Sequence, residues 1–299
     1  MSKPSDVRRV AIVGATHGNE MAGGVLVDKW RRRPELATRP SFETRLFIGN
    51  PRARELVVRY VDRDLNRSFA PESLEDLDAG AYEVERARTI LGEIGAAGAW
   101  PADVVFDLHT TTAAMKKTIV LVNHAPFNLE LAAWAQAHDE EVRVFSWLDE
   151  SLPRRSLASA FARGVTLEFG PTPQGVLRAE TLAFMERTLG ACLDFVEAHN
   201  RGAAPERGSG KLECFTYVRR EDYPRDASGA PTAAVHPELQ DRDYQALENG
   251  APIFLGYDGE VYRLEVEPGR VLYPVFVNEA AYYEKGVAFC LTERQVLSV

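Results

Sequence analysis

Apolar runs and polar breaks alternate along the first two thirds of the chain. Runs typical of buried strands cover 9–13, 42–48, 103–108, 118–122, 142–145 and 164–169. Between them, patterns with helical character cover 19–30, 51–60, 81–91, 129–137 and 179–199. This alternation predicts an α/β fold in which helices flank both faces of a mixed, mostly parallel sheet.

The pattern changes after the last of these helices. Residues 200–210 are small and polar, as in a linker. Beyond them, short strand patterns are separated by turn sequences such as 226–229 and 257–260, and no long helical pattern follows. We therefore expect a catalytic domain at 1–204 and a smaller β-rich domain at 205–299.

Composition narrows the class of protein. A chain of 299 residues with 45% hydrophobic content can bury a full core. Its net charge of -9 and the absence of a basic stripe make nucleic acid an unlikely partner. No apolar run in the sequence suits a signal peptide or a membrane span, and Cys192, Cys214 and Cys290 form no disulfide or thiolate-metal pattern. We expect a cytoplasmic protein with reduced cysteines and no membrane association.

Two polar clusters follow strand patterns in the first domain. His17 and Glu20 lie just after the first strand, and His109 lies at the end of the strand pattern over 103–108. The carboxyl ends of parallel strands meet at the edge where α/β folds bind ligands. Two imidazoles and one carboxylate are the donors of many catalytic zinc sites, in which the fourth position is left for water. Alternatively, His17 caps the following helix and His109 is a hydrogen-bonded core histidine.

Two further carboxylates lie near these candidate ligands. Asp107 should project to the same strand face as His109, where a metal-bound imidazole usually has a carboxylate partner. Glu168 lies in an otherwise apolar strand end, where an isolated charge is costly. Partial burial would raise the pKa of Glu168 and suit it to general base catalysis. The alternative for Glu168 is a buried structural ion pair.

Arg59, Asn66 and Arg67 form a polar cluster in the region after the second strand. Guanidinium groups can bind a carboxylate in bidentate fashion and can stabilise an oxyanion. By spacing alone, these cations are more typical of a solvated surface.

At these residues the sequence resembles the aspartoacylase family, which includes aspartoacylase and the type III aminoacylase. The resemblance extends from Val10 to about Cys290. It is carried by Thr16-His17-Gly18-Asn19-Glu20, the segment 59–67, Asp107-Leu108-His109, the segment 167–171, His236-Pro237 and the segment 278–285. It implies a carboxypeptidase-like N-terminal domain, a β-rich C-terminal domain that helps to close the substrate channel, and hydrolysis of N-acylated amino acids.

The resemblance also implies a role for each matched residue. One zinc ion per chain would be bound by His17, Glu20 and His109, and Glu168 would activate water. Arg59 would contact the scissile carbonyl and its oxyanion, Asn66 and Arg67 would bind the substrate α-carboxylate, and Tyr282 would contact substrate from the second domain. The family implies a homodimer or homotetramer.

One departure from the family bears on the substrate. Aspartoacylase holds the side-chain carboxylate of N-acetylaspartate with an arginine about ten residues before its general base, and an ungapped match places Ala158 there. Arg154 and Arg155 lie just upstream, and Arg220 and Lys285 match other cations of that pocket. Details such as Glu20-Met21 and the segments 239–243, 250–254 and 285–289 are closer to the type III aminoacylase, so N-acetylated aromatic or S-conjugated cysteine substrates are favoured.

Three alternatives stay open. The first is an aspartoacylase that acts on N-acetyl-L-aspartate. The second is a zinc exopeptidase or a desuccinylase on the same scaffold. The third is a non-catalytic zinc-binding protein, which the presence of ligands, base and oxyanion partner together disfavours.

Overall fold

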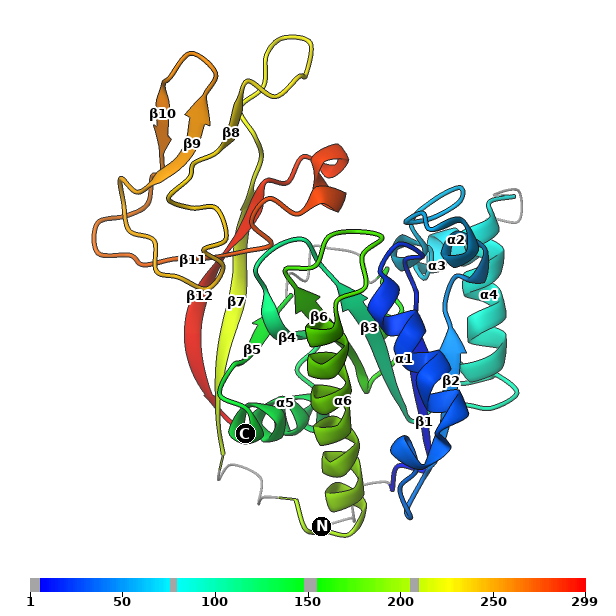
Figure 1. Cartoon of the computed structure of the whole chain (residues 1–299). Helices are drawn as coiled ribbons and strands as arrows, with labels where there is room; N and C mark the ends of the chain where they lie inside the picture. The colour runs from blue at the N-terminus through cyan, green and yellow to red at the C-terminus, as the bar shows by residue number, and fades with distance from the viewer. Residues whose placement is uncertain (1–5, 76–79, 148–154, 205–209) are drawn as a thin grey trace.

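A nine-stranded mixed sheet organises the computed structural model of the chain, which describes residues 6–75, 80–147, 155–204 and 210–299. The strand order is β11-β12-β7-β5-β4-β6-β3-β1-β2 (Figure 1). The first six strands along the chain are β1 (Arg9–Gly14), β2 (Glu43–Ile48), β3 (Val104–Thr110), β4 (Lys116–Leu121), β5 (Val142–Ser146) and β6 (Gly164–Gly170). The predicted α/β class and the sheet flanked by helices are confirmed.

Helices cover both faces of this sheet. Alternate residues of β1 contribute to two separate cores, because successive side chains of a strand point to opposite faces. One face packs against α1 (Met21–Arg32), α5 (Pro126–His138) and α6 (Ala179–Asn200). The other face packs against α4 (Tyr82–Ile94) and the 3₁₀ helix η2 (Leu65–Arg67). Shorter helical segments are η1 (Pro34–Leu36), α2 (Pro51–Leu56), α3 (Pro71–Glu75) and η3 (Ala158–Ala160).

The C-terminal third extends the same sheet. Strand β7 (Lys211–Glu221) pairs in parallel with β5, and β12 (Phe289–Ser298) and β11 (Tyr273–Val275) continue outward from it in antiparallel fashion. Figure 1 shows a second sheet above this edge, formed by β8 (Ala233–Val235), β9 (Pro252–Gly256) and β10 (Val261–Arg263). The 3₁₀ helix η4 (Ala280–Lys285) leads into β12.

One predicted helix is shorter in the structure, and two further details were not predicted. The helix expected over 51–60 ends at Leu56, because Val57 adopts a left-handed backbone conformation with φ of 55°. Strand β4 is antiparallel to its neighbour β6, a direction that apolar runs do not encode. The short helix α3 had no counterpart in the sequence pattern.

The sheet brings the two predicted polar clusters together. Strands β1 and β3 are parallel neighbours, and β3 and β6 are parallel neighbours in which His109 pairs with Glu168. The carboxyl ends of all three strands therefore meet at one edge, as the sequence predicted. In the described part of the chain, no helix has the length and apolarity that a bilayer crossing requires. The three cysteines are buried free thiols.

Candidate metal centre and active site

The side chains of His17, Glu20 and His109 converge at this edge. Each offers a ligand atom within 4.8 Å of the others, and all three residues are buried. Nδ1 of His17 lies 2.6 Å from one carboxylate oxygen of Glu20, and Nδ1 of His109 lies 2.8 Å from the other. Both imidazoles thus present the same ring nitrogen to one carboxylate.

The opposite ring nitrogens face two further carboxylates. Nε2 of His17 lies 2.9 Å from Oδ1 of Asp64, and Nε2 of His109 lies 2.8 Å from Oδ2 of Asp107. Thr16 fixes Asp107 by donating its hydroxyl to Oδ1 at 2.5 Å. A carboxylate on the far nitrogen sets the tautomer and orientation of a metal-binding imidazole. The sequence suggested Asp107 for this position, whereas Asp64 was not identified.

These residues fit a zinc ion. Two imidazoles and a carboxylate are a donor set of catalytic zinc, and the far nitrogen of each ring already has an acidic neighbour. Oδ2 of Asp107 is buried and has no hydrogen-bond partner, because its approach to the His109 ring is not in hydrogen-bond geometry.

A tight strand-to-helix turn places the first two candidate ligands. The turn closes with a hydrogen bond from the Glu20 amide to the His17 carbonyl at 3.2 Å, and α1 begins at the next residue. Gly18 is required in this turn, since a Cβ atom there would lie 2.0 Å from the backbone of Ala53. Contact between this turn and α2 therefore restrains the backbone that carries His17 and Glu20.

Glu168 faces the cluster from β6. It is the strand neighbour of His109 and is partly buried. Burial raises its pKa well above the ordinary value, and the negative charges of Glu20 and Glu279 add to this effect, whereas His109 and Arg59 oppose it. A carboxyl group with a raised pKa beside a candidate metal site is suited to proton transfer.

Arg59 reaches the cluster from the loop after α2. Its guanidinium donates to Glu20 at 3.1 Å and lies 3.6 Å from Asp64. Its Nε is buried without a hydrogen-bond partner. Burial alone would lower the pKa of Arg59, but Glu20 and Asp64 raise it, so the guanidinium stays charged in the centre.

The structure also brings Asn66, Arg67 and Tyr282 to this region. The Asn66 side chain is engaged by protein groups: its oxygen accepts from the Leu157 amide at 2.9 Å, and Nδ2 lies 3.2 Å from Nε2 of His109. Arg67 donates one N–H to the Asn66 carbonyl at 2.8 Å. Tyr282 comes from η4, where burial raises its pKa and the nearby Arg67 opposes that rise.

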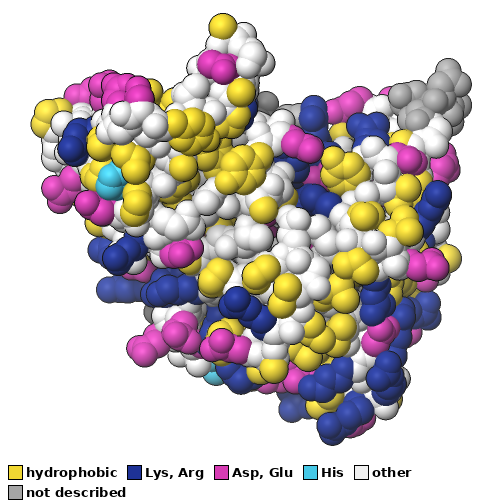
Figure 2. Space-filling view, turned by 45° about the horizontal axis from the view of Figure 1, so that its top comes forward, with side chains coloured by type: hydrophobic (Ala, Val, Ile, Leu, Met, Phe, Trp, Pro, Cys, Tyr) yellow, Lys and Arg dark blue, Asp and Glu magenta, His cyan; other side chains and the backbone are white. Residues whose placement is uncertain are grey.

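The cations suggested for a side-chain pocket lie in different places. Nζ of Lys285 donates to Asp64 at 2.8 Å. Its pKa is lowered by burial and by Arg59 and Arg67, against the attraction of Asp64. We call residues 210–299 the C-terminal lobe. On the face in Figure 2, basic and acidic side chains lie side by side in the hollow between this lobe and the rest of the molecule.

The structure describes two of the other three suggested cations. Arg155 is exposed and lies 3.5 Å from Glu72, and Arg220 is exposed on β7. Arg154 lies outside the described residues. Ala158 is buried in η3.

Glu279 is a second residue that the sequence did not single out. Its buried carboxylate accepts from the Thr111 hydroxyl, from the Thr112 amide at 2.7 Å and from the Ala281 amide at 3.0 Å. Thr111 and Thr112 follow β3, whereas Ala281 lies in η4. Glu279 therefore ties the C-terminal lobe to the loop that follows His109.

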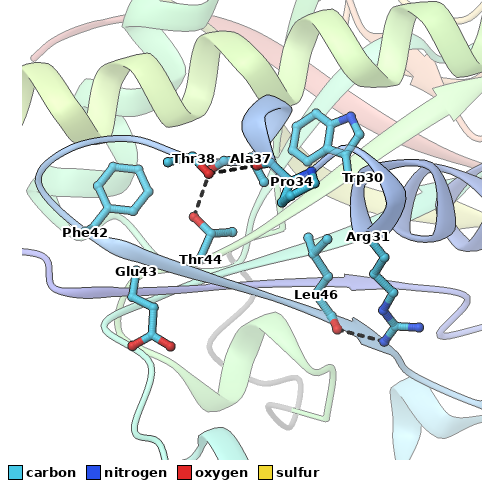
Figure 3. A pocket seen from close by; sticks show the side chains of 9 residues that line it. All are labelled: Trp30, Arg31, Pro34, Ala37, Thr38, Phe42, Glu43, Thr44 and Leu46. Atoms are coloured by element: carbon cyan, nitrogen blue, oxygen red, sulfur yellow. Dashed lines mark hydrogen bonds between the residues drawn. The ribbon is translucent and has the colours of Figure 1, made fainter.

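Figure 3 shows a pocket of about 270 Å³ beside β2. It is lined by residues of α1, η1, β2 and the segment between η1 and β2, including Trp30, Phe42 and Leu46. None of its lining residues belongs to the site described above.

Comparison with known proteins identifies the chain as a member of a hydrolase family. Residues 6–196 match the succinylglutamate desuccinylase/aspartoacylase catalytic domain, and residues 210–294 match the AstE/AspA barrel-sandwich hybrid domain. The chain belongs to the succinylglutamate desuccinylase/aspartoacylase family. The resemblance noted in the sequence is thus confirmed.

Individual relatives carry two different names. The chain is 42% identical to the aspartoacylase of Danio rerio over 299 residues. This match covers 98% of this chain and 94% of the relative. It is 40% identical over 299 residues to the N-acyl-aromatic-L-amino acid amidohydrolase (carboxylate-forming) of Homo sapiens, with 98% and 92% covered. The crystal structure of murine aminoacylase 3 is similar, with a TM-score of 0.93, 36% identity and coverage of 99% of this chain and 98% of that one.

Proposed function

We propose that the protein is a zinc-dependent amidohydrolase that converts N-acyl-L-amino acids to a carboxylate and a free amino acid. One observation carries the proposal: the Nδ1 atoms of His17 and His109 converge on Glu20 while Glu168 faces them from the adjacent strand. His17, Glu20 and His109 would hold one zinc ion. When bound there, zinc would polarise the acyl carbonyl and acidify a water molecule.

The protein groups divide the remaining work. Glu168 takes a proton from the attacking water and passes it to the departing amine, a general base and then general acid role that its raised pKa suits. Arg59 presents N–H groups where negative charge develops on the carbonyl oxygen. Arg67 binds the α-carboxylate and so orients the amide toward the water.

We propose N-acetylated aromatic amino acids or S-conjugated cysteines as the favoured substrates. In an ungapped match, Ala158 stands at the position where aspartoacylase has its side-chain arginine. Arg155 lies against Glu72 at the surface, and Lys285 is engaged by Asp64. These placements leave Arg155 and Lys285 less suited to binding a second carboxylate on the substrate. Because a relative named aspartoacylase is equally similar, N-acetyl-L-aspartate is the alternative substrate.

The test is kcat/KM of zinc-loaded enzyme for N-acetyl-L-tyrosine and N-acetyl-L-aspartate. We expect at least a tenfold preference for the tyrosine derivative, about 1.4 kcal/mol in transition-state binding. The same preference for the aspartate derivative would assign the alternative substrate. Arg155→Ala tests whether that arginine contacts the substrate, and we expect it to leave both values unchanged because Arg155 lies against Glu72 at the surface.

Further substrates separate the other candidate functions. Turnover of dipeptides or succinylated amino acids in place of acetylated ones would favour an exopeptidase or a desuccinylase. Fully zinc-loaded protein that hydrolyses none of these compounds would refute the amidohydrolase proposal and favour a non-catalytic zinc protein.

A further inference from the structure

Glu83 is a fully buried carboxylate that lies outside the metal centre. It is in the first turn of α4. Oε1 accepts from the Val61 amide at 2.6 Å, and Oε2 accepts from the amides of Asp62 and Arg63 at 3.0 and 3.1 Å. Three consecutive backbone N–H groups thus surround one anion, an arrangement that binds negative charge strongly.

Hydrogen bonds run in both directions between this loop and α4. The Asp62 carboxylate accepts from the Tyr82 amide at 2.7 Å, at the first residue of the helix. One free N–H of the helix end is thereby satisfied, and the loop is fixed from both directions. The segment 61–63 has little freedom to move relative to α4.

The anchored segment lies between two residues of the active centre. Arg59 precedes it and donates to Glu20, and its carbonyl accepts from the Gly18 amide at 3.2 Å. Asp64 follows it directly and contacts His17 at 2.9 Å. The directions in which Arg59 and Asp64 enter the centre therefore depend on the backbone that Glu83 holds.

Glu83 is also linked, through Asn50, to the turn that carries the first candidate ligand. Oε1 accepts from Nδ2 of Asn50 at 3.0 Å. The Asn50 amide donates to the Ala15 carbonyl at 2.8 Å, two residues before His17. One carboxylate therefore links the two loops that meet at His17.

We propose that Glu83 is a positioning residue for the hydrolytic reaction, acting by fixing residues 61–63 and so the placement of Arg59 and Asp64. Burying a charge is costly, and the N–H donors that offset this cost for Glu83 belong to the two segments that adjoin the site. The kinetic part of this inference rests on the proposed function, because it assigns Arg59 to the oxyanion. Loss of alignment should then lower kcat more than it raises KM.

Glu83→Gln is the direct test. The amide keeps one acceptor oxygen, but its NH₂ group faces N–H donors, so two of the four hydrogen bonds are lost. We expect kcat to fall about 10- to 100-fold with KM within about threefold of wild type. We also expect amide hydrogen exchange at 61–63 to speed up at least about tenfold while exchange in β1 and β3 stays unchanged. Glu85→Gln, an exposed glutamate on the same helix, is the control and should change neither readout.

A double-mutant cycle separates positioning from general weakening. In an Arg59→Ala background, Glu83→Gln should reduce kcat by less than it does in the wild-type background, because one of the two groups it positions is already absent. A full multiplicative loss in that background would overturn the proposal. So would normal kcat, or unchanged exchange at 61–63, in folded Glu83→Gln.

Two further measurements cover the other outcomes. If Glu83→Gln fails to fold, Asp62→Ala removes the hydrogen bond from the Tyr82 amide to the loop 61–63. It should lower kcat by about 3- to 10-fold, and unchanged kcat would refute the positioning role of this network. If wild type hydrolyses no acylated amino acid, the proposed function fails separately. The exchange at 61–63 and the visible spectrum of cobalt-substituted protein would still show whether Glu83 positions Asp64 against His17.

Discussion

Asp243 gives a prediction about stability and pH that can be worked out from its surroundings. Its carboxylate is buried and accepts from the Val277 amide at 3.0 Å and from the Ala114 amide at 3.1 Å. Burial raises its pKa to about 7, although the backbone hydrogen bonds oppose the rise. Ala114 follows β3 and Val277 follows β11, so this residue joins the C-terminal lobe to the loop beyond His109.

The sign follows from proton binding in the two states. The unfolded chain has an ordinary aspartate with a pKa of about 3.9. Between pH 5 and 7 the folded protein holds a proton on Asp243 and the unfolded chain does not. The free energy of unfolding therefore falls as pH rises through this window, by about 1.4 kcal/mol per pH unit, or about 2 to 3 kcal/mol in total. From about one pH unit above 7 the contribution is constant.

The assay is urea denaturation at several pH values between 5 and 8 for wild type and Asp243→Asn. Asparagine cannot ionise, so the difference in unfolding free energy between the two proteins should change by about 2 to 3 kcal/mol over the window. Loss of one hydrogen bond in the variant adds only an offset that does not depend on pH. Glu238→Gln, an exposed acid nearby, should keep the wild-type slope. Parallel curves for wild type and Asp243→Asn would refute the reasoning.

Three other predictions concern the site. Glu168→Gln should keep zinc bound, as measured by elemental analysis, and lower kcat by about 10²- to 10⁴-fold; near-normal turnover would exclude Glu168 as the base. Asp64→Asn should weaken zinc binding about 10- to 100-fold in a chelator competition, and unchanged affinity would show that the contact with His17 does not tune the metal. Glu279→Ala should lower the free energy of unfolding by about 3 to 5 kcal/mol by thermal or urea melts, because it removes the acceptor of several buried donors; a loss below about 1 kcal/mol would contradict the proposed tie between the lobes.

The sequence predicted the parts of the fold that depend on apolar patterning. The strands after which His17 and His109 lie were expected at one sheet edge, and β1 and β3 are indeed adjacent and parallel. Patterning could not show that β4 runs antiparallel or that β7 joins the main sheet beside β5. Those features depend on pairing between distant segments, which leaves no local periodicity.

The residues missed at the site have a common cause. Asp64 lies in a polar loop and Glu83 in an amphipathic helix, where acids are ordinarily solvated. Both are buried here because they accept hydrogen bonds from segments distant in sequence, such as the His17 turn and the loop 61–63. Lys285 was suggested as a substrate-binding cation, and the structure shows that it also donates a hydrogen bond to Asp64, which the sequence did not indicate. Only the folded chain shows which acid a given cation meets.

The bond between Lys285 and Asp64 joins positions 221 residues apart. During synthesis the N-terminal part of the chain emerges first. The ribosome therefore adds His17, Glu20, His109 and Glu168 well before it reaches η4. The centre nonetheless lacks its last contacts until the final strand is within reach of the sheet. A nascent or truncated chain would therefore carry the chemical groups of the site without its finished geometry, which delays activity until synthesis is nearly complete.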